Sequence, residues 1–293
     1  MQYMKKYVQE ATDENIWTSI KNNTFGRNKD IKDFIDGLEL IDESACISLD
    51  AKWGDGKTFF VRQIEEVLKY VLANQRADEE NPIEKLPSYE YLKDNEMMAK
   101  IDLKHSYLPI YYNAWMYDNH SDPLMSLLLV MTKTCRGVYD TKIDSEKISK
   151  KLVEALATLP ISLGEFKANP FTAIEKLQGK SMDILSLVQT EEEIRERVKG
   201  IFNDIIVERA QKLVIFIDEL DRCRPSFAIE MLERIKHYFD DERVIFVVSL
   251  NKEQLIHTIT NYYGSGFDAT RYLNKFFDVN INLPAMDKYQ KQT

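Results

Sequence analysis

Cysteine is scarce in this sequence. Its three cysteines, Cys46, Cys135 and Cys223, lie far apart among 293 residues and form no Cys-x-x-Cys pair. This spacing argues against a disulfide framework, and four scattered histidines give no zinc-site pattern. Isolated cysteines beside apolar segments behave as small buried hydrophobes, which is typical of a protein kept in the reducing cytosol.

Long apolar runs are also missing. The longest mostly apolar stretch, residues 123–131, is about half the length of the ~20 residues that span a bilayer. The lysines near the amino terminus are not followed by the apolar segment of a signal peptide. We therefore expect a soluble, cytoplasmic protein that has no membrane segment.

Positive charge is in short supply, with 39 Lys and Arg against 48 Asp and Glu and a net charge of −9. Nucleic-acid binding depends on clustered Lys and Arg that neutralise phosphates. The densest basic stretch, residues 146–151, is typical of a solvated helix face. The composition therefore does not support direct nucleic-acid binding.

Apolar residues are plentiful, at 44% of the chain, and they fall into continuous segments that alternate with helical periodicity. Such strands indicate a parallel sheet covered on both faces, so we predict an α/β fold with a parallel β-sheet flanked by helices. The expected strands are 45–49, 108–112, 213–217, 244–250 and 278–283. The expected helices are 30–40, 58–72, 123–134, 227–239, 252–262 and 272–277.

The whole chain, residues 1–293, is predicted to form one domain with two insertions. Its core comprises about 25–74, 105–137 and 212–284. Residues 75–104 are charged and contain Pro82 and Pro87, which indicates a surface insertion or a mobile loop. Residues 138–211 have mostly helical patterns and are expected to form an inserted helical lobe.

A glycine-rich segment, Asp-Ala-Lys-Trp-Gly-Asp-Gly-Lys-Thr at 50–58, follows one predicted strand and opens a predicted helix. That is the context of a phosphate-binding loop, in which glycine lets the backbone curl and the helix start presents free N–H groups. Lys57 can reach the β- and γ-phosphates, and the Thr58 hydroxyl can ligate Mg²⁺. We expect nucleotide contacts from Trp53, Gly54, Asp55, Gly56, Lys57 and Thr58.

The loop departs from the Gly-x-x-x-x-Gly-Lys-[Ser/Thr] pattern at its first position, which is Ala51. Alanine is tolerated there if its φ is negative, so the conformation of Ala51 bears on nucleotide affinity. The alternative interpretation is a chance Gly-Lys-Thr at a helix start. The preceding strand and the acidic motif below disfavour that alternative.

Two adjacent acids, Asp218 and Glu219, end the apolar segment 213–217, and Asp221 follows. Ligands gather beyond the carboxyl ends of parallel strands, so Asp218 is expected to hold Mg²⁺ through water beside the phosphate-binding loop. Glu219 is the first candidate for the general base that polarises the attacking water, and Asp221 is the second. A loop of solvated surface acids is the alternative.

Arg222 is a candidate catalytic residue, because arginine commonly stabilises charge on a transferring phosphoryl group, in cis or from a neighbouring subunit. A salt bridge to Asp221 or a helix-start contact is the alternative for this side chain. The next predicted strand ends near Ser249 and Asn251, either of which can sense the γ-phosphate. Asn251 is equally suited to cap the helix that follows it.

These motifs together resemble those of the KAP family of P-loop NTPases. The resemblance is carried by Trp-Gly-x-Gly-Lys-Thr at 53–58, Asn-Ala-Trp at 113–115, Ile-Asp-Glu-Leu-Asp-Arg-Cys at 217–223 and Tyr-Leu-x-Lys-x-Phe at 272–277. It runs from about residue 27 to residue 284. The Walker motifs alone are generic, and the Asn-Ala-Trp segment and the Asp-Arg ending make the combination more specific.

The resemblance implies an additional-strand NTPase core related to the AAA+ and STAND groups, which binds ATP and Mg²⁺. It also implies a helical insertion between the Walker A and Walker B strands. Many relatives carry transmembrane helices in that insertion, whereas this sequence is similar to soluble bacterial members linked to phage exclusion and antiviral defence. Relatives often continue into a C-terminal region, so an effector module is expected beyond residue 293.

Two further segments acquire a meaning from the resemblance. Phe25-Gly26-Arg27 resembles a short motif that contacts the nucleotide base, and its alternative is a turn before a helix. Asn113 and Trp115 are expected to brace the sheet end and the phosphate-binding loop. Stacking of Trp115 on a base is less favoured than packing in the core.

Three functional hypotheses follow. The first is an ATP-hydrolysing switch or assembly ATPase, whose nucleotide state sets homo-oligomerisation or contact with a partner effector protein. The second is a nucleotide-binding scaffold with little turnover. The third is a small-molecule or nucleic-acid kinase, which requires an acceptor pocket that the sequence does not indicate. The antiviral role rests on family analogy alone.

Overall fold

Five parallel strands form one sheet in the order β2-β3-β4-β1-β5. The computed structural model describes residues 10–78, 82–120, 122–137, 196, 199–200, 203, 210–238 and 241–284. Within these residues the strands are β1 (Ala45–Asp50), β2 (Tyr107–Asn113), β3 (Lys212–Asp218), β4 (Val244–Leu250) and β5 (Val279–Asn282). Every pairing in the sheet is parallel, which confirms the predicted fold class.

The strands β3 and β4 are buried along their whole length. Successive side chains of a strand point to opposite faces, so Leu213 and Ile215 enter the core on one side of the sheet while Val214 and Phe216 enter the core on the other. Both faces are therefore covered. This double burial explains why the two strands are continuous apolar runs in the sequence.

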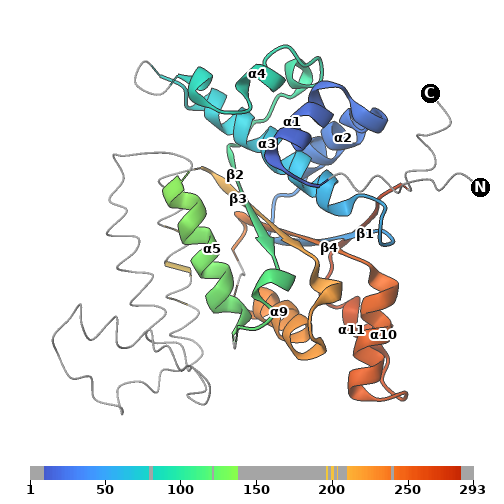
Figure 1. The fold of residues 1–293 in the computed structure, drawn as a ribbon. Coiled ribbons are helices and arrows are strands. Elements are labelled where there is room, and N and C mark those ends of the chain that lie inside the picture. Colours follow the sequence, from blue (N-terminus) through green and yellow to red (C-terminus); the bar gives the residue numbers. More distant parts are fainter. Residues whose placement is uncertain are drawn as a thin grey trace, which may run out of the picture.

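One face of the sheet is covered by the helices nearest the amino terminus (Figure 1). They are α1 (Asp13–Lys21), α2 (Asn28–Leu38), α3 (Lys57–Gln75) and the short α4 (Tyr89–Leu92). In α2 the buried residues are Ile31, Phe34, Ile35 and Leu38, which recur at helical spacing. Through this apolar stripe α2 packs into the core on this face of the sheet.

The opposite face is covered by α5 (Pro123–Gly137), α9 (Pro225–Tyr238), α10 (Lys252–Tyr263) and α11 (Ala269–Leu273). Buried residues of α9 again repeat at helical spacing, with Phe227, Met231 and Ile235 among them. These helices form the second core together with the residues of β3 and β4 that lie on this face of the sheet. The sheet thus separates two apolar cores, one on each side.

The strand order decides how the site is arranged. Strand β4 lies between β1, which leads into the glycine-rich loop, and β3, which ends in the acidic motif. This is the additional-strand arrangement that the family resemblance implies. Because all strands are parallel, the carboxyl ends of β1, β3 and β4 meet at one edge of the sheet.

The segment 75–104 is folded where the structure describes it. After α3 it forms a 3₁₀ turn (Ile83–Lys85), α4 and a second 3₁₀ turn (Met98–Lys100). Leu92 and Met97 are buried against the core that also contains residues of α1, α2 and α3. These turns pack on the domain, which favours the predicted surface insertion over its alternative, a mobile loop.

Other elements lie close to their predicted positions. The short helix expected at 272–277 is α11, which begins earlier, and β5 is shorter than the predicted strand 278–283. Most of the predicted helical lobe, 138–211, lies outside the described residues. None of the helices in the described part of the chain is long and apolar enough to cross a membrane.

Candidate functional site

The glycine-rich loop connects the end of β1 to the start of α3. Its curl is made by Gly54 and Gly56, whose φ values are +92° and +79°, a region that residues with a Cβ rarely adopt. The loop is tied to the sheet because the Ala51 N–H donates to the Leu250 carbonyl at 3.2 Å. It is closed on itself because the Lys52 N–H donates to the Asp55 carboxylate at 3.1 Å.

Several N–H groups of the loop are left without an acceptor. Those of Gly54, Gly56, Lys57 and Thr58 donate to no group among the described residues. A Cβ placed on Gly54 would meet no atom within 4 Å, so the space beside this residue is open. Free amides at a helix start suit a phosphate.

Ala51 departs from the glycine of the sequence pattern without distorting the loop. It is absent from the residues that have a positive φ, so its Cβ causes no backbone strain. Its carbonyl also has a role, because it accepts a hydrogen bond of 2.7 Å from the Lys57 ammonium. A second carbonyl, that of Lys52, accepts from the same ammonium at 3.2 Å. Two backbone carbonyls of the loop therefore fix the position of the Lys57 ammonium.

Asp218 ends β3 on the same edge of the sheet and is almost fully buried, with 1% of its surface exposed. Its Oδ1 accepts from the Glu219 N–H and its Oδ2 accepts from the Tyr111 hydroxyl, both at 3.0 Å. Thr58, which faces this motif, supplies a hydroxyl. An all-oxygen set of this kind fits Mg²⁺, which needs one or two carboxylates when phosphate and water complete its shell.

Glu219 adopts a left-handed backbone conformation, with φ of 65°, which turns the chain sharply after β3. Its Oε1 accepts from the Thr58 hydroxyl at 3.3 Å, and its Oε2 lies 2.5 Å from the Arg222 Nε. Burial, followed by the negative charge of Asp218, raises the pKa of Glu219 above 4.5. The residue is thus a half-buried carboxylate that faces the phosphate-binding loop.

The other two residues of the acidic motif differ from expectation in their contacts. Asp221, the second candidate for the base, is 7% exposed and accepts a 2.5 Å hydrogen bond from the Trp53 indole. It therefore fastens the loop to the turn after β3. Arg222 pairs with Glu219 and not with Asp221, and its guanidinium lies 5.5 Å from the Trp115 ring centroid.

Two polar residues at the end of β4, Asn251 and Ser249, differ in their contacts. The Asn251 side chain accepts from the Gln254 N–H at 3.3 Å, so it caps α10 in this structure. Ser249 is fully buried, and its hydroxyl has no hydrogen-bond partner among the described residues. The structure therefore favours Ser249 as the polar group at this strand end.

Two motifs of the family resemblance lie around the site. Arg27 reaches the loop, because it donates to the Asp55 carbonyl at 3.0 Å, and its side chain is buried. The Asn113 side chain accepts from the Met116 N–H and so braces the end of β2. Trp115 is 55% exposed, which corrects the expectation that it packs in the core. The Phe25 side chain lies outside what the structure describes.

Sequence reasoning missed two residues beside the site, Tyr111, which contacts Asp218, and Arg62, which contacts the Tyr111 ring. Tyr111 belongs to an apolar strand and Arg62 to an amphipathic helix, so neither belongs to a recognised motif. Their position depends on the register in which β2 pairs with β3, where Asn113 lies opposite Asp218. Only that register places the Tyr111 hydroxyl beside the Asp218 carboxylate.

A parallel sheet with a phosphate-binding loop after β1, an acidic motif after β3 and a strand between them defines a P-loop NTPase domain. The model of the KAP family P-loop domain matches residues 27–293. The chain therefore belongs to the KAP family of P-loop NTPases.

A solved structure, described as a Walker-type ATPase of Pyrococcus abyssi, is similar to this chain at 10% sequence identity and a TM-score of 0.37. The similarity covers 92% of this chain and 57% of that one, so this chain spans little more than half the length of its neighbour. The search of curated proteins found no significant match.

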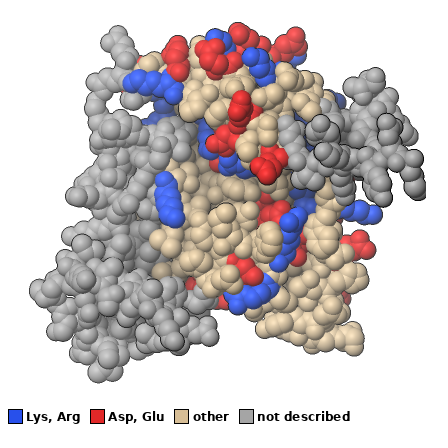
Figure 2. All heavy atoms as spheres, in the orientation of Figure 1, with Lys and Arg blue, Asp and Glu red and all other residues tan. Residues whose placement is uncertain are grey.

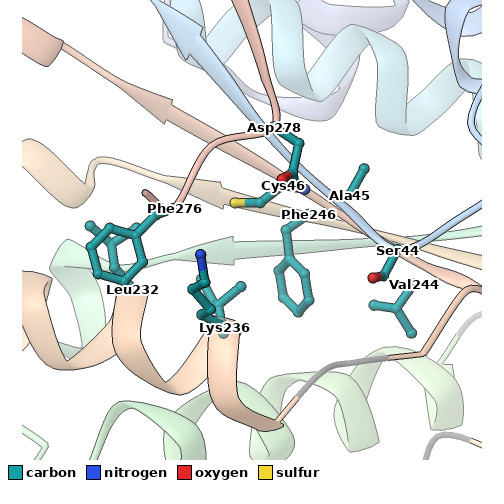
Figure 3. A pocket seen from close by; sticks show the side chains of 10 residues that line it. Ser44, Ala45, Cys46, Leu232, Lys236, Val244, Phe246, Phe276 and Asp278 are labelled. Atoms are coloured by element: carbon teal, nitrogen blue, oxygen red, sulfur yellow. Dashed lines mark hydrogen bonds between the residues drawn. The ribbon is translucent and has the colours of Figure 1, made fainter. Parts of the chain in front are cut away.

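A separate cavity of about 200 Å³ lies at the opposite edge of the sheet, where β1 and β4 begin (Figure 3). Its lining combines apolar residues such as Phe246 and Phe276 with polar ones, and the Cys46 thiol and the Lys236 side chain point toward it. Burial raises the pKa of Cys46, so its thiol stays protonated at neutral pH. The cavity does not contact the phosphate-binding loop.

The charges on the face shown in Figure 2 are mixed in sign. Lys and Arg side chains are interspersed with Asp and Glu over the described surface, and they do not form a continuous basic band there. Arg222 and Arg224, which follow the acidic motif, are each engaged by a carboxylate, from Glu219 and Asp118 respectively. The charges of Arg222 and Arg224 are therefore neutralised within the chain.

Proposed function

We propose that this chain binds ATP together with Mg²⁺, hydrolyses it, and acts as a nucleotide-driven switch or assembly ATPase. The observation that carries the proposal is the hydrogen bond of 3.3 Å between Thr58 and Glu219. It brings the start of α3 and the end of β3 together although the two residues are 161 positions apart. Free loop amides, a lysine and two carboxylates are thereby gathered at one edge of the sheet.

Hydrolysis requires that a water oxygen attack the γ-phosphorus, that the bond to the bridging oxygen break and that the water lose a proton. We assign the acceptance of that proton to Glu219. Its burial raises the pKa of the carboxyl, as does the charge of Asp218, and a base is more effective when its pKa approaches the working pH.

Lys57 and the free N–H groups of the loop would bind the phosphate oxygens and hold them in place. Mg²⁺, when bound with the nucleotide, supplies positive charge that offsets the charge of the phosphates. Thr58 and Asp218 are the residues that would hold it, because both offer the oxygen ligands that Mg²⁺ prefers. Asp218 is already oriented by two hydrogen bonds, so little ordering remains to be done on binding.

The ion pair between Arg222 and Glu219 sets a condition on turnover. The guanidinium lies 2.5 Å from one carboxylate oxygen, which accepts no hydrogen bond from the described residues, so the contact is an ion pair that Glu219 would exchange for a water molecule during turnover. Release would free Arg222, whose side chain is 42% exposed, to meet a phosphate of its own site or of a neighbouring subunit. A homo-oligomer or a partner effector protein is the natural trigger for that exchange.

The same ion pair favours one alternative, a nucleotide-binding scaffold with little turnover. If Arg222 stays on Glu219 in the nucleotide-bound state, the base remains engaged and the protein binds ATP without cleaving it. The scaffold and the switch therefore differ in the fate of this single contact. Phosphate release distinguishes them directly.

The test is phosphate release from Mg·ATP over a series of protein concentrations, beside direct nucleotide binding. Lys57→Ala is expected to weaken binding by about 10- to 100-fold, the range for a lost hydrogen bond to a charged group. Glu219→Gln is expected to keep binding and to lower kcat by about 10²- to 10⁴-fold. Lys52→Ala, which removes an exposed lysine from the same loop and keeps its carbonyl, is the matched control.

Turnover that is lost in both variants and kept in the control would support the ATPase. A rate that rises more steeply than protein concentration would add an arginine acting between subunits. Binding without phosphate release in the unaltered chain would refute the ATPase and leave the scaffold.

We also propose antiviral defence as the setting of this activity, on the strength of the resemblance to soluble bacterial members of the family. Bacteria that express the chain should resist phage better than bacteria that express Lys57→Ala. Equal plaque counts for the two strains would count against this setting and would not affect the enzymatic proposal.

A further inference from the structure

The Asp218 carboxylate is held from two sides. One oxygen accepts from the N–H of the next residue, Glu219, and the other accepts from the Tyr111 hydroxyl, each at 3.0 Å. Asp218 is 1% exposed, so solvent does not provide these contacts. The tyrosine hydroxyl is thus the side-chain group, among the described residues, that fixes the rotation of this carboxylate.

Tyr111 is in turn held by a cation. The Arg62 guanidinium carbon lies 4.8 Å from the centroid of the Tyr111 ring, the distance of a cation–π contact. Burial and then the negative charge of Asp218 raise the pKa of Tyr111, so its hydroxyl keeps the proton that it donates. The ring cannot swing away without losing both contacts.

Arg62 belongs to α3, and its own position depends on the amino-terminal helix. Its guanidinium pairs with Glu65 on α3 and with Asp13 in the first turn of α1, the latter at 2.7 Å. Two further polar contacts join the same helices, from Trp17 to Glu66 at 2.6 Å and from Gln63 to the Ser19 hydroxyl at 2.8 Å. Helix α1 is therefore attached to α3 by three polar contacts, one of which involves Arg62.

We propose that Tyr111 and Arg62 are positioning residues for the metal ligand Asp218, and that helix α1 tunes the Mg²⁺ affinity of the site through Asp13. The proposal rests on the assignment of Asp218 to Mg²⁺ in the proposed function. It adds a path of direct contacts, Asp13–Arg62–Tyr111–Asp218, that runs from an exposed helix end to the metal site. A partner or segment that displaces Asp13 would thereby change metal binding.

A network of this composition also stabilises the fold, and the two roles make different predictions. A contact that only stabilises the fold changes the free energy of unfolding and leaves the Mg²⁺ dependence of a folded site unchanged. A positioning role changes the Mg²⁺ concentration at which nucleotide binding is half-complete. Nucleotide binding without Mg²⁺ should then stay the same, because the loop amides and Lys57 are untouched.

The experiment uses the full chain, a fluorescent N-methylanthraniloyl derivative of ATP and a titration with MgCl₂, with EDTA as the metal-free reference. Tyr111→Phe is expected to raise the Mg²⁺ midpoint about tenfold, because it removes one hydrogen bond to a charged group. Asp13→Asn is expected to raise it by about two- to threefold, the size of a weakened exposed ion pair. Urea unfolding of each variant separates folding from metal binding.

Tyr112→Phe is the matched control. It removes the hydroxyl of the neighbouring tyrosine, which is fully buried and bonded to Ser126 on the other face of the sheet. Its Mg²⁺ midpoint should equal that of the unaltered chain even if it lowers stability more than Tyr111→Phe. An unshifted midpoint in folded Tyr111→Phe would overturn the proposal.

The unaltered chain separates this proposal from the proposed function. If it binds the probe in an Mg²⁺-dependent way and releases no phosphate, the ATPase fails while the midpoints still test the positioning residues. If Tyr111→Phe does not fold, the soluble variant Asp13→Asn decides, because the Asp13 side chain is 60% exposed and tolerates substitution. Probe binding that ignores Mg²⁺ in every variant would refute the positioning role outright.

Discussion

At the scale of single residues, the charge state of Glu219 is decided by opposing influences. Burial raises its pKa most, and the negative charge of Asp218 raises it further. The positive charge of Arg222 lowers it, Asp221 raises it again and the hydrogen bond from Thr58 lowers it. The pKa therefore stays above 4.5 while Arg222 limits the increase.

Arg222→Gln is expected to move the acid limb of the pH–rate profile to higher pH. Glu219 accepts a proton only when it is deprotonated, so activity falls as pH drops through its pKa. Removal of a charge that lowers this pKa makes the fall begin at higher pH. Single-turnover phosphate release from Mg·ATP, measured across the pH range, reports the midpoint separately from any change in the maximal rate.

Arg224→Gln provides the control for this shift. Arg224 pairs with Asp118 at 3.2 Å and is not among the main causes of the raised pKa of Glu219. Its acid midpoint should match that of the unaltered protein. A common midpoint for all three proteins would contradict the assignment of Glu219 as the titrating base.

At the scale of secondary-structure elements, helix α1 belongs to the domain although it precedes the family match, which begins at residue 27. Ile16 and Ile20 have no exposed surface, and both lie in the core beneath α2 and α3. The Thr12 side chain caps the helix by accepting from the Asn15 N–H. The helix is thus packed and capped like the elements within the family match.

Ile16→Ala is expected to lower the free energy of unfolding by about 2–5 kcal/mol, because it leaves a cavity in a closed core. Leu40→Ala removes an equally large side chain that is 83% exposed, and it should change stability by less than about 0.5 kcal/mol. Urea unfolding followed by circular dichroism measures both. A loss for Ile16→Ala as small as that of the control would show that α1 is not part of the cooperative core.

Elements that are buried on two faces are the ones that the sequence predicts best. The expected strand 244–250 coincides with β4, because a strand buried on both faces is a nearly continuous apolar run, in which Ser249 is the single polar residue. The sequence predicts the segment 75–104 less well, because Leu92, Met97 and Leu103 are buried at irregular intervals within a polar stretch. Short helical turns that pack through single residues have no periodicity to detect.

At the scale of the whole molecule, the sequence locates the motifs of the site but not the contacts between them. The pairing of Thr58 with Glu219 follows from the strand order, which the family resemblance implies. The contact of Tyr111 with Asp218 requires the register of β2 on β3, and apolar patterns that are identical on both faces do not specify register. Asn251 shows the same limit, because a cap and a sensor require the same residue type.

Nucleotide binding should stabilise the whole domain, because the site joins elements from both halves of the sequence. A ligand that binds only the folded chain adds about 2.7 kcal/mol at a hundredfold excess over its Kd. For a protein of this size we expect Mg·ATP to raise Tm by roughly 5 °C. Differential scanning calorimetry at several nucleotide concentrations measures this shift.

Two variants test whether the increase in Tm comes from nucleotide bound at the phosphate-binding loop. Glu219→Gln should keep the full shift, because the loop amides and Lys57 are intact and hydrolysis no longer depletes the nucleotide. Lys57→Ala should lose about half of the shift or more, because a 10- to 100-fold weaker affinity leaves the same nucleotide concentration at only about 10 to 1 times Kd. An equal shift in Lys57→Ala and the unaltered protein would mean that the stabilising nucleotide is bound elsewhere, with the cavity beside Cys46 and Lys236 as the next place to look.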